Sequence, residues 1–346
     1  MFLDDYYWDG KEFRKKDKTL SDLLLGLNAL HKITPPPTIP PYFNVLRSRI
    51  LSKGPTNIWE KFDYFISRLA LTPLQKQDAI TKANNISRIL RNAYYALLQQ
   101  TLPVYVVVGS HMKTTAIAPP SDIDILFILP NHNFKRFDSY ENNGQSALMQ
   151  EIRSKLINSF PNTEIKADGQ AILVPFASYA VEVVPCFRGN NGVFITPDSN
   201  DNWQWKLTNP LAEKTLLLKS NVRTKGNTIK LIKMVKAWRD YCSVELKSLV
   251  IELRAIYFLE KWPYFDKGSV YYDWMIKDFF AALLNYVDGS CIIPGLEEKI
   301  QYGNIWKSKV ETALVRAQKA CSYESNKQLE LAAEEWKKIF GDRFPS

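Results

Sequence analysis

The sequence has few of the side chains that build metal clusters or disulfide frameworks. It contains four cysteines, which are widely scattered and form no Cys-x-x-Cys pair, and only three histidines among 346 residues. A structural zinc cluster needs four such ligands at close spacing, so this pattern argues against one. Scattered cysteines also favour a reduced, cytoplasmic setting over a secreted one.

Long apolar runs are missing as well. No stretch of about 18 apolar residues exists, so the sequence predicts no membrane span. The chain begins Met1-Phe2-Leu3-Asp4-Asp5, which lacks the basic region and following apolar stretch of a secretory signal. We therefore expect no association with membranes.

What the chain has in excess is positive charge. Its 45 basic and 36 acidic residues give a net charge of +9 and an isoelectric point near 9.1. A positive field concentrates anions, which favours nucleotides or nucleic acid as partners. A basic surface without any such ligand is the alternative. The length allows two domain-sized halves, and the apolar fraction of 46% is ordinary for a globular protein.

The pattern of helices and strands divides the chain into three parts. Residues 1–50 form an N-terminal extension, in which the prolines of residues 35–41 predict an extended strap. Residues 51–210 begin with a long helix, predicted from the N-cap Thr72, from Pro73 and from the capping-box residue Gln75. Residues 211–346 show helical periodicity almost throughout.

The middle part predicts strands at residues 104–108, 122–129 and 179–184, the last ending at Pro185. It also predicts a helix near residues 146–160 and a hairpin turn at Asp168-Gly169. The last part predicts five helices, at residues 229–241, 247–261, 273–286, 297–320 and 323–340. The fold class is therefore α+β, with a mixed sheet and a helical second lobe on either side of a central cleft.

Three acids stand out because they lie in apolar strands. Side chains at i and i+2 of a strand share one face, so Asp122 and Asp124 project together. Two adjacent carboxylates repel each other unless a cation or a proton lies between them, and carboxylate oxygens suit Mg²⁺. Glu182 lies in a similar strand, where an unpaired buried charge would be costly. If it joined the other two, the three acids could hold a pair of metal ions.

A Gly109-Ser110 pair follows the first strand and precedes the two aspartates. Glycine lets the backbone approach a phosphate closely, and the serine hydroxyl and free amides can bind phosphate oxygens. Alone, this pair is a weak signal that is better explained as an ordinary turn, and an Asp-x-Asp pair is common in solvated turns. The combination of a strand, Gly-Ser, Asp-x-Asp within a second strand and a later strand acid is much more specific.

These motifs resemble the active-site signature of the polymerase-β-like nucleotidyltransferases, and more narrowly of the bacterial cGAS/DncV-like nucleotidyltransferases (CD-NTases). The resemblance runs from about Thr72 to the C-terminus. It also includes later segments at residues 181–187, 205–210, 236–238, 247–252 and 336–345.

The resemblance implies a site for each of these motifs. Asp122, Asp124 and Glu182 would be catalytic and would hold two Mg²⁺ (or Mn²⁺) ions. Gly109 and Ser110 would contact the donor triphosphate, and Lys236 and Ser248 of the helical lobe would grip the same phosphates. From the residues alone, Lys236 could instead belong to a solvated helix face, and Ser248 could be a mid-helix serine bonded to its own backbone.

The sequence departs from the family pattern in three places. The third acid is Glu182, where Asp is more usual. The basic residue before the threonine is Lys113 rather than arginine, and lysine binds phosphate only as a point charge. The zinc-bearing insertion of the animal DNA sensor is absent, so activation by duplex DNA is not supported.

The function implied is the joining of nucleoside triphosphates (ATP, GTP or pyrimidine NTPs) into a cyclic di- or trinucleotide, with pyrophosphate release. The resemblance further implies anti-phage (CBASS) signalling and allows for accessory regulatory proteins. Two alternatives stay open. One is a nucleotidyltransferase that extends RNA ends or adenylylates a protein or drug. The other is a catalytically silent nucleotide- or RNA-binding module, although acids in a cleft would repel phosphate without metals.

Overall fold

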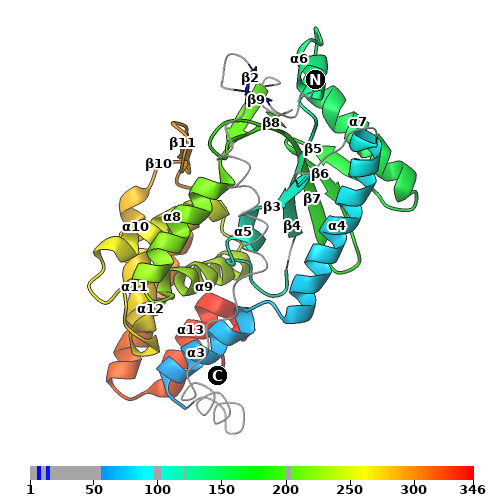
Figure 1. The fold of residues 1–346 in the computed structure, drawn as a ribbon. Coiled ribbons are helices and arrows are strands. Elements are labelled where there is room, and N and C mark those ends of the chain that lie inside the picture. Colours follow the sequence, from blue (N-terminus) through cyan, green and yellow to red (C-terminus); the bar gives the residue numbers. More distant parts are fainter. Residues whose placement is uncertain (1–5, 9–12, 16–55, 97–102, 121, 199–203) are drawn as a thin grey trace.

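The computed structural model describes residues 6–8, 13–15, 56–96, 103–120, 122–198 and 204–346. The proline-rich strap predicted at residues 35–41 lies outside these ranges. Near the N-terminus, β1 (Tyr6–Trp8) and β2 (Phe13–Lys15) pair in antiparallel fashion. The remaining elements form a sheet lobe and a helical lobe, as predicted (Figure 1).

The sheet lobe is built on seven strands. Their order is β3-β4-β7-β6-β5, and β8 and β9 extend from the far end of β7. Only the β4–β7 pair is parallel, which makes the sheet mixed, as predicted. The strands are β3 (Tyr105–Val107), β4 (Asp122–Ile128), β5 (Lys166–Asp168), β6 (Ala171–Val174), β7 (Ala180–Arg188), β8 (Phe194–Asp198) and β9 (Gln204–Thr208).

One face of this sheet carries the core of the lobe. Ile123 and Ile125 of β4 are fully buried there, together with Val181 and Val183 of β7. Helices α4 (Pro73–Tyr95) and α7 (Gly144–Ser159) cover that face, and the short α6 (His132–Asp138) packs beside α7. Because strand side chains alternate, the residues between these four must lie on the opposite face.

Local sequence signals determine several of these elements. The predicted capping box is present, since the Thr72 hydroxyl accepts from Gln75 N at 3.2 Å and Gln75 Oε1 accepts from Thr72 N at 2.8 Å. The Asp168-Gly169 turn joins β5 to β6 as predicted, with Gly169 at φ +59°. The helix predicted near residues 146–160 is α7.

The prediction that the third strand stops at Pro185 is wrong, because β7 continues through Pro185 to Arg188. Proline has no N–H to donate, so a strand tolerates it only where that position faces no partner. The carbonyl of Cys186 accepts from Leu129 N at 2.8 Å, so Cys186 faces β4 and Pro185 faces the opposite edge. On that edge the pairing with β6 ends at Val183 and the pairing with β8 begins only at Phe187.

The helical lobe contains α8 (Pro210–Arg223), α9 (Asn227–Tyr241), α10 (Ser248–Lys261), α11 (Tyr272–Leu283), α12 (Lys307–Ser325) and α13 (Leu329–Phe340). The helix predicted at residues 297–320 is wrong in its first part. Residues Lys299–Gln301 instead form β11, which pairs with β10 (Ser290–Ile292). Gly303 follows at φ +56°, a conformation that interrupts a helix, so α12 starts only at Lys307. The last predicted helix is divided between α12 and α13.

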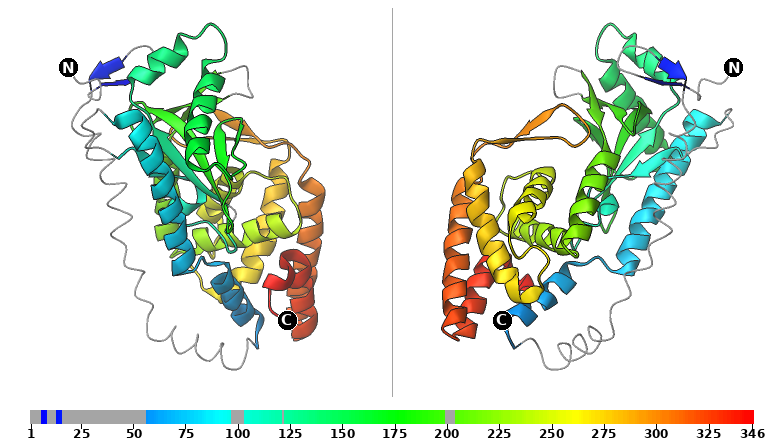
Figure 2. Two further views of the ribbon diagram at one scale, coloured as in Figure 1. Left: turned by 90° about the vertical axis from the view of Figure 1, so that its right-hand side faces the viewer. Right: turned by 60° about the vertical axis from the view of Figure 1, so that its left-hand side comes forward.

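Helix α3 (Ile58–Leu69) lies with the helical lobe, although the predicted division at residue 51 assigned it to the sheet lobe. Its fully buried Phe62 and Phe65 pack against Trp336, Phe340 and Phe344 near the C-terminus, with ring centroids 4.6–6.3 Å apart. The two views in Figure 2 show α3 beside α13, while α4 runs along the sheet. Packing therefore places the chain's crossing between lobes at the α3–α4 connection.

Candidate active site

A cleft of about 600 Å³ lies between the two lobes. The sheet lobe contributes the turn after β3 and one face of β4, and the helical lobe contributes α8, α9 and α10. Six of the seven predicted site residues line it: Gly109, Ser110, Asp122, Asp124, Lys236 and Ser248.

Within the described residues, no helix combines the length and apolar character that a bilayer crossing requires.

The three acids lie on one face of the sheet. In the parallel pairing of β4 with β7, Asp124 is directly opposite Glu182, and Asp122 is two residues earlier in β4. Directly opposed residues project to the same side, which is the side away from the buried Ile123 and Ile125. The strand register therefore brings Glu182 next to the two aspartates. Asp122 and Asp124 line the cleft, whereas Glu182 does not.

The acids interact strongly with one another. Burial and the charge of Asp122 raise the pKa of Asp124. Burial, Asp124 and Asp122 together raise the pKa of Glu182 to about 7. The carboxyl groups of Asp124 and Glu182 lie close enough to share a proton when one of them is protonated. Three carboxylates at this spacing cannot all be ionised without a compensating cation or proton.

The donor set suits a hard divalent cation, because all three side chains offer carboxylate oxygens. In the described part of the chain, no three His, Cys, Asp or Glu side chains are already arranged closely enough to hold a metal ion by themselves. A cation here would therefore need further oxygen ligands from outside this trio. Mg²⁺ commonly obtains such ligands from water and substrate phosphates.

Gly109 is required by the position of Asp124. It adopts φ +60°, and a Cβ atom added to it would lie 1.9 Å from Asp124 Oδ2. The backbone is fixed at the same place, since Val108 N donates to the Asp124 carbonyl at 2.9 Å. Ser110 follows in the four-residue helix α5 (Gly109–Met112), and its carbonyl accepts from Thr115 N and Ala116 N. The predicted Gly-Ser turn thus lies directly against the acid trio.

Lys236 and Ser248 come from the opposite wall, and both already have partners. Lys236 is 3% exposed, so it does not belong to a solvated helix face. Its Nζ donates to Glu252 Oε1 at 2.8 Å and to Thr115 Oγ1 at 3.0 Å. Ser248 is the first residue of α10 rather than a mid-helix residue, and its Oγ accepts from Arg239 Nη1 at 2.6 Å.

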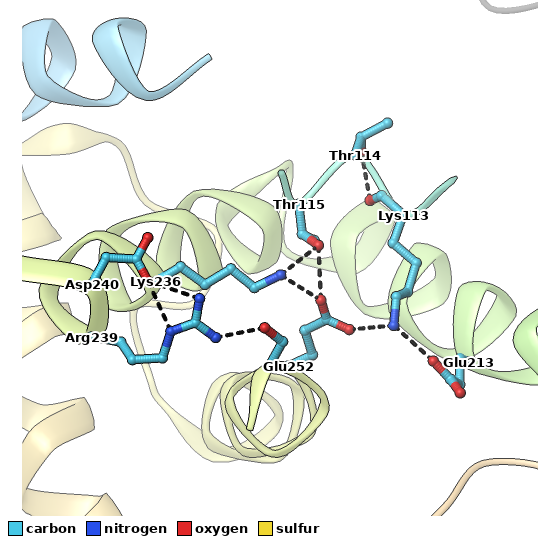
Figure 3. Close-up of polar contacts among 9 residues, drawn as sticks. Lys113, Thr114, Thr115, Glu213, Lys236, Arg239, Asp240 and Glu252 are labelled. Atoms are coloured by element: carbon cyan, nitrogen blue, oxygen red, sulfur yellow. Dashed lines mark hydrogen bonds and ion pairs between the residues drawn. The ribbon is translucent and has the colours of Figure 1, made fainter. Parts of the chain in front are cut away.

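The group that joins these walls was not predicted from the sequence. Glu252 of α10 is 2% exposed and also binds Lys113 Nζ at 2.6 Å, while Glu213 of α8 binds the same ammonium at 2.7 Å (Figure 3). One signal was available, because Glu252 is the one charged residue in the otherwise apolar stretch of residues 249–253. A buried acid in such a run needs a cationic partner.

This network makes one part of the stability sensitive to acid. Burial acts to raise the pKa of Glu252, but Lys236 and Lys113 outweigh burial and lower it from 4.5 to about 2. A carboxyl with a lowered folded-state pKa stabilises the fold above pH 4.5 and loses that contribution as the pH falls toward 2.

We expect the free energy of unfolding of the wild type to fall by about 2 kcal/mol more than that of Glu252→Gln between about pH 5 and pH 3. Thermal or urea unfolding of both proteins across this range measures the difference. Parallel pH profiles for the two proteins would contradict the assignment of the shift to Glu252.

Solved structures identify the fold. Vibrio cholerae DncV, solved as a cyclic AMP-GMP synthase with the linear intermediate pppA(3′,5′)pG, superposes with a TM-score of 0.67 at 13% identity, covering 84% of this chain and 97% of DncV. Escherichia coli MS115-1 CdnC, solved in a complex with a HORMA protein, superposes with a TM-score of 0.64 at 16% identity, covering 84% and 99%. The fold is that of a nucleotidyltransferase, as the sequence predicted.

Sequence comparison adds to the similarity in fold. Residues 57–221 match the family described as Second Messenger Oligonucleotide or Dinucleotide Synthetase domain. A probable cyclic nucleotide synthase of Bacillus cereus (strain VD146) is 24% identical over 278 residues, which cover 69% of this chain and 81% of that protein. The chain is thus similar to cyclic nucleotide synthases in its fold, and in its sequence over the synthetase domain at residues 57–221.

Proposed function

We propose that this enzyme joins nucleoside triphosphates into a cyclic di- or trinucleotide and releases pyrophosphate at each step. The observation that carries the proposal is the register of β4 and β7, which gathers Asp122, Asp124 and Glu182 against the Gly109 turn. Asp122, Asp124 and Gly109 line a cleft of about 600 Å³, within the size range of small-molecule sites.

We further propose that Asp122, Asp124 and Glu182 hold two divalent cations, Mg²⁺ or Mn²⁺. The all-carboxylate donor set supports this, and burial together with the neighbouring carboxylates raises the pKa values of Asp124 and Glu182, which a bound cation would counteract. Bound cations would activate the attacking ribose hydroxyl and neutralise charge on the departing pyrophosphate.

The protein's own groups hold the substrates. Gly109 leaves space at the turn, and the hydroxyl of Ser110 donates to the donor triphosphate. Lys236 and Ser248 bind the same phosphates from the helical lobe. A carboxylate oxygen of Asp124 or Glu182 accepts the proton of the attacking hydroxyl. Binding both nucleotides in one cleft makes the joining step effectively intramolecular.

The biological setting that we propose is bacterial anti-phage (CBASS) signalling, in which the product activates a separate effector. Its support is the match of residues 57–221 to the synthetase domain and the similar structure of CdnC, which was solved with a HORMA protein. An accessory protein that regulates this chain is part of the proposal.

Incubation of the full chain with all four NTPs and Mg²⁺ tests the function. We expect pyrophosphate release and a small phosphatase-resistant product, which mass spectrometry after nuclease digestion identifies. Transfer of label to RNA or protein instead would support a different nucleotidyltransferase. Because an accessory protein can control activity, the assay is repeated with phage-infected extract. No pyrophosphate and no product under either condition would refute the proposal.

A further inference from the structure

Glu252 is the most deeply buried acid in the cleft wall, and its hydrogen bonds and ion pairs go to Lys113, Thr115 and Lys236. We propose that Glu252 is a positioning residue, which holds Lys236 at the junction of the two lobes in the place where a polyphosphate meets it. The inference rests on the proposed function, since it assigns Lys236 to phosphate binding. It concerns a residue that would touch no substrate itself.

The two oxygens of Glu252 bind different parts of the molecule. Oε2 accepts from Lys113, which lies in the loop just after the Gly-Ser turn of the sheet lobe. Oε1 accepts from Lys236 of α9 and from the hydroxyl of Thr115 in that same loop. Figure 3 shows the carboxyl group of Glu252 between the two ammonium groups. One side chain of α10 therefore ties the phosphate-binding turn of one lobe to the lysine of the other.

The hydrogen bonds around Lys236 can be assigned without ambiguity. The Thr115 hydroxyl donates its hydrogen to Glu252 and accepts one from Lys236, which closes a three-membered ring of hydrogen bonds. An ammonium has three hydrogens, and this ring uses two of them. The third hydrogen remains for an acceptor in the cleft, whose wall includes Lys236.

Lys113 differs from Lys236 in this respect. Its ammonium lies between two carboxylates, those of Glu213 and Glu252. Although burial acts to lower the pKa of Lys113, these carboxylates outweigh burial and raise it. Two carboxylates thus neutralise the positive charge of Lys113, and this residue serves to orient Glu252. Lys236 shares a single carboxylate and is the ammonium left to meet an anion.

The charges explain why the carboxylate matters for position. Lys113 and Lys236 repel each other, and Glu252 lies between them and attracts both. With a neutral side chain at this position, Lys236 would lose its only ionic partner within the described residues. A buried, unpaired lysine moves toward solvent or loses its proton, and either change removes it from its place in the cleft wall.

The test measures binding of magnesium tripolyphosphate to the full chain by calorimetry, which needs no base specificity and no turnover. We expect Glu252→Gln to weaken this binding at least tenfold, and Glu252→Asp, which keeps the charge, to restore part of it. Glu335→Gln is the matched control. Glu335 is also a buried glutamate of the helical lobe with a lysine partner, Lys338, but it lies in α13 away from the cleft. We expect this control to bind tripolyphosphate as the wild type does.

A role limited to stability gives a different result. Glu252→Gln would then melt at a lower temperature but bind tripolyphosphate with unchanged affinity, which would overturn the proposal. If Glu252→Gln does not fold, Thr115→Val decides, because it removes the two hydrogen bonds of the ring that involve the Thr115 hydroxyl and keeps every charge. We expect a weakening of two- to fivefold, and no change would overturn the proposal.

The outcome also separates this inference from the proposed function. If tripolyphosphate binding depends on Glu252 but the wild type forms no nucleotide product, only the proposed function is refuted. Product formation with polyphosphate binding that is indifferent to Glu252 would refute only the positioning role. If the wild type does not bind tripolyphosphate at all, the positioning role is also refuted, whatever the activity assay shows.

Discussion

The variant Asp124→Asn should join nucleotides at least about 1000-fold more slowly than the wild type, a loss of about 4 kcal/mol in transition-state stabilisation. Asp124 is the central acid of the trio. It lines the cleft, pairs in register with Glu182 and lies against the Gly109 turn. An amide of the same shape keeps the packing but removes the charge that a divalent cation needs.

The same substitution should not weaken the fold. Asp122 and Glu182 both lie close enough to Asp124 to shift its titration or share its proton, so their mutual repulsion opposes folding. Removing one charge relieves that repulsion, and we expect Asp124→Asn to gain about 1 kcal/mol of stability in the absence of divalent cations. Thermal unfolding with and without Mg²⁺, beside the activity assay, measures both effects.

Asp78→Asn is the control for this experiment, because Asp78 lies on α4 of the same lobe, paired with Lys82 at 2.6 Å on the surface. It should retain full activity. If Asp124→Asn were as active as Asp78→Asn, the acid trio would not be the catalytic centre. If it were inactive and also strongly destabilised, unfolding would explain the loss of activity, and the expected gain in stability would be refuted.

Substitution of Gly109 by alanine should lower activity about 100-fold or more. The added methyl would lie 1.9 Å from Asp124 Oδ2, and no such contact is possible, so the carboxyl group must move by about 1 Å. A misplacement of this size in a reacting group costs about 100-fold in rate. Alanine at φ +60° also costs about 1–2 kcal/mol in backbone strain.

The variant Gly303→Ala separates the effect of backbone strain from the effect of moving the Asp124 carboxyl group. Gly303 adopts φ +56°, nearly the same as Gly109, but an added Cβ would meet no atom within 4 Å. Both variants should therefore lose similar stability, measured by chemical unfolding, while only Gly109→Ala loses activity. Equal activity of the two variants would show that Asp124 is not fixed by the turn, and would contradict the close approach.

Much of the local structure follows from short stretches of sequence. Thr72 and Gln75 form their capping box within four residues, and Gly169 supplies the positive φ that its turn requires. The pairing of Asp122 with Asp124 on one face needs only the two-residue period of a strand. These features depend on neighbours in the chain, and for that reason the sequence predicted them correctly.

Other features depend on which elements pack together. Pro185 continues a strand because β6 and β8 leave a gap on its edge. Helix α3 belongs to the helical lobe because Phe62 and Phe65 pack against residues near the other end of the chain. The helical pattern around Lys299 gave no sign of a strand, since a three-residue strand is too short to show its own period.

The sequence by itself determined the fold class, the family signature and the chemical character of the acids and the Gly-Ser turn, because each depends on residue type and close spacing. The tertiary structure decided that Glu182 joins the aspartates, since this depends on the register between two strands distant in the chain. It also decided that Lys236 and Lys113 share Glu252 across the lobes. Which charges of distant segments meet depends on how those segments pack, and no local sequence pattern records that arrangement.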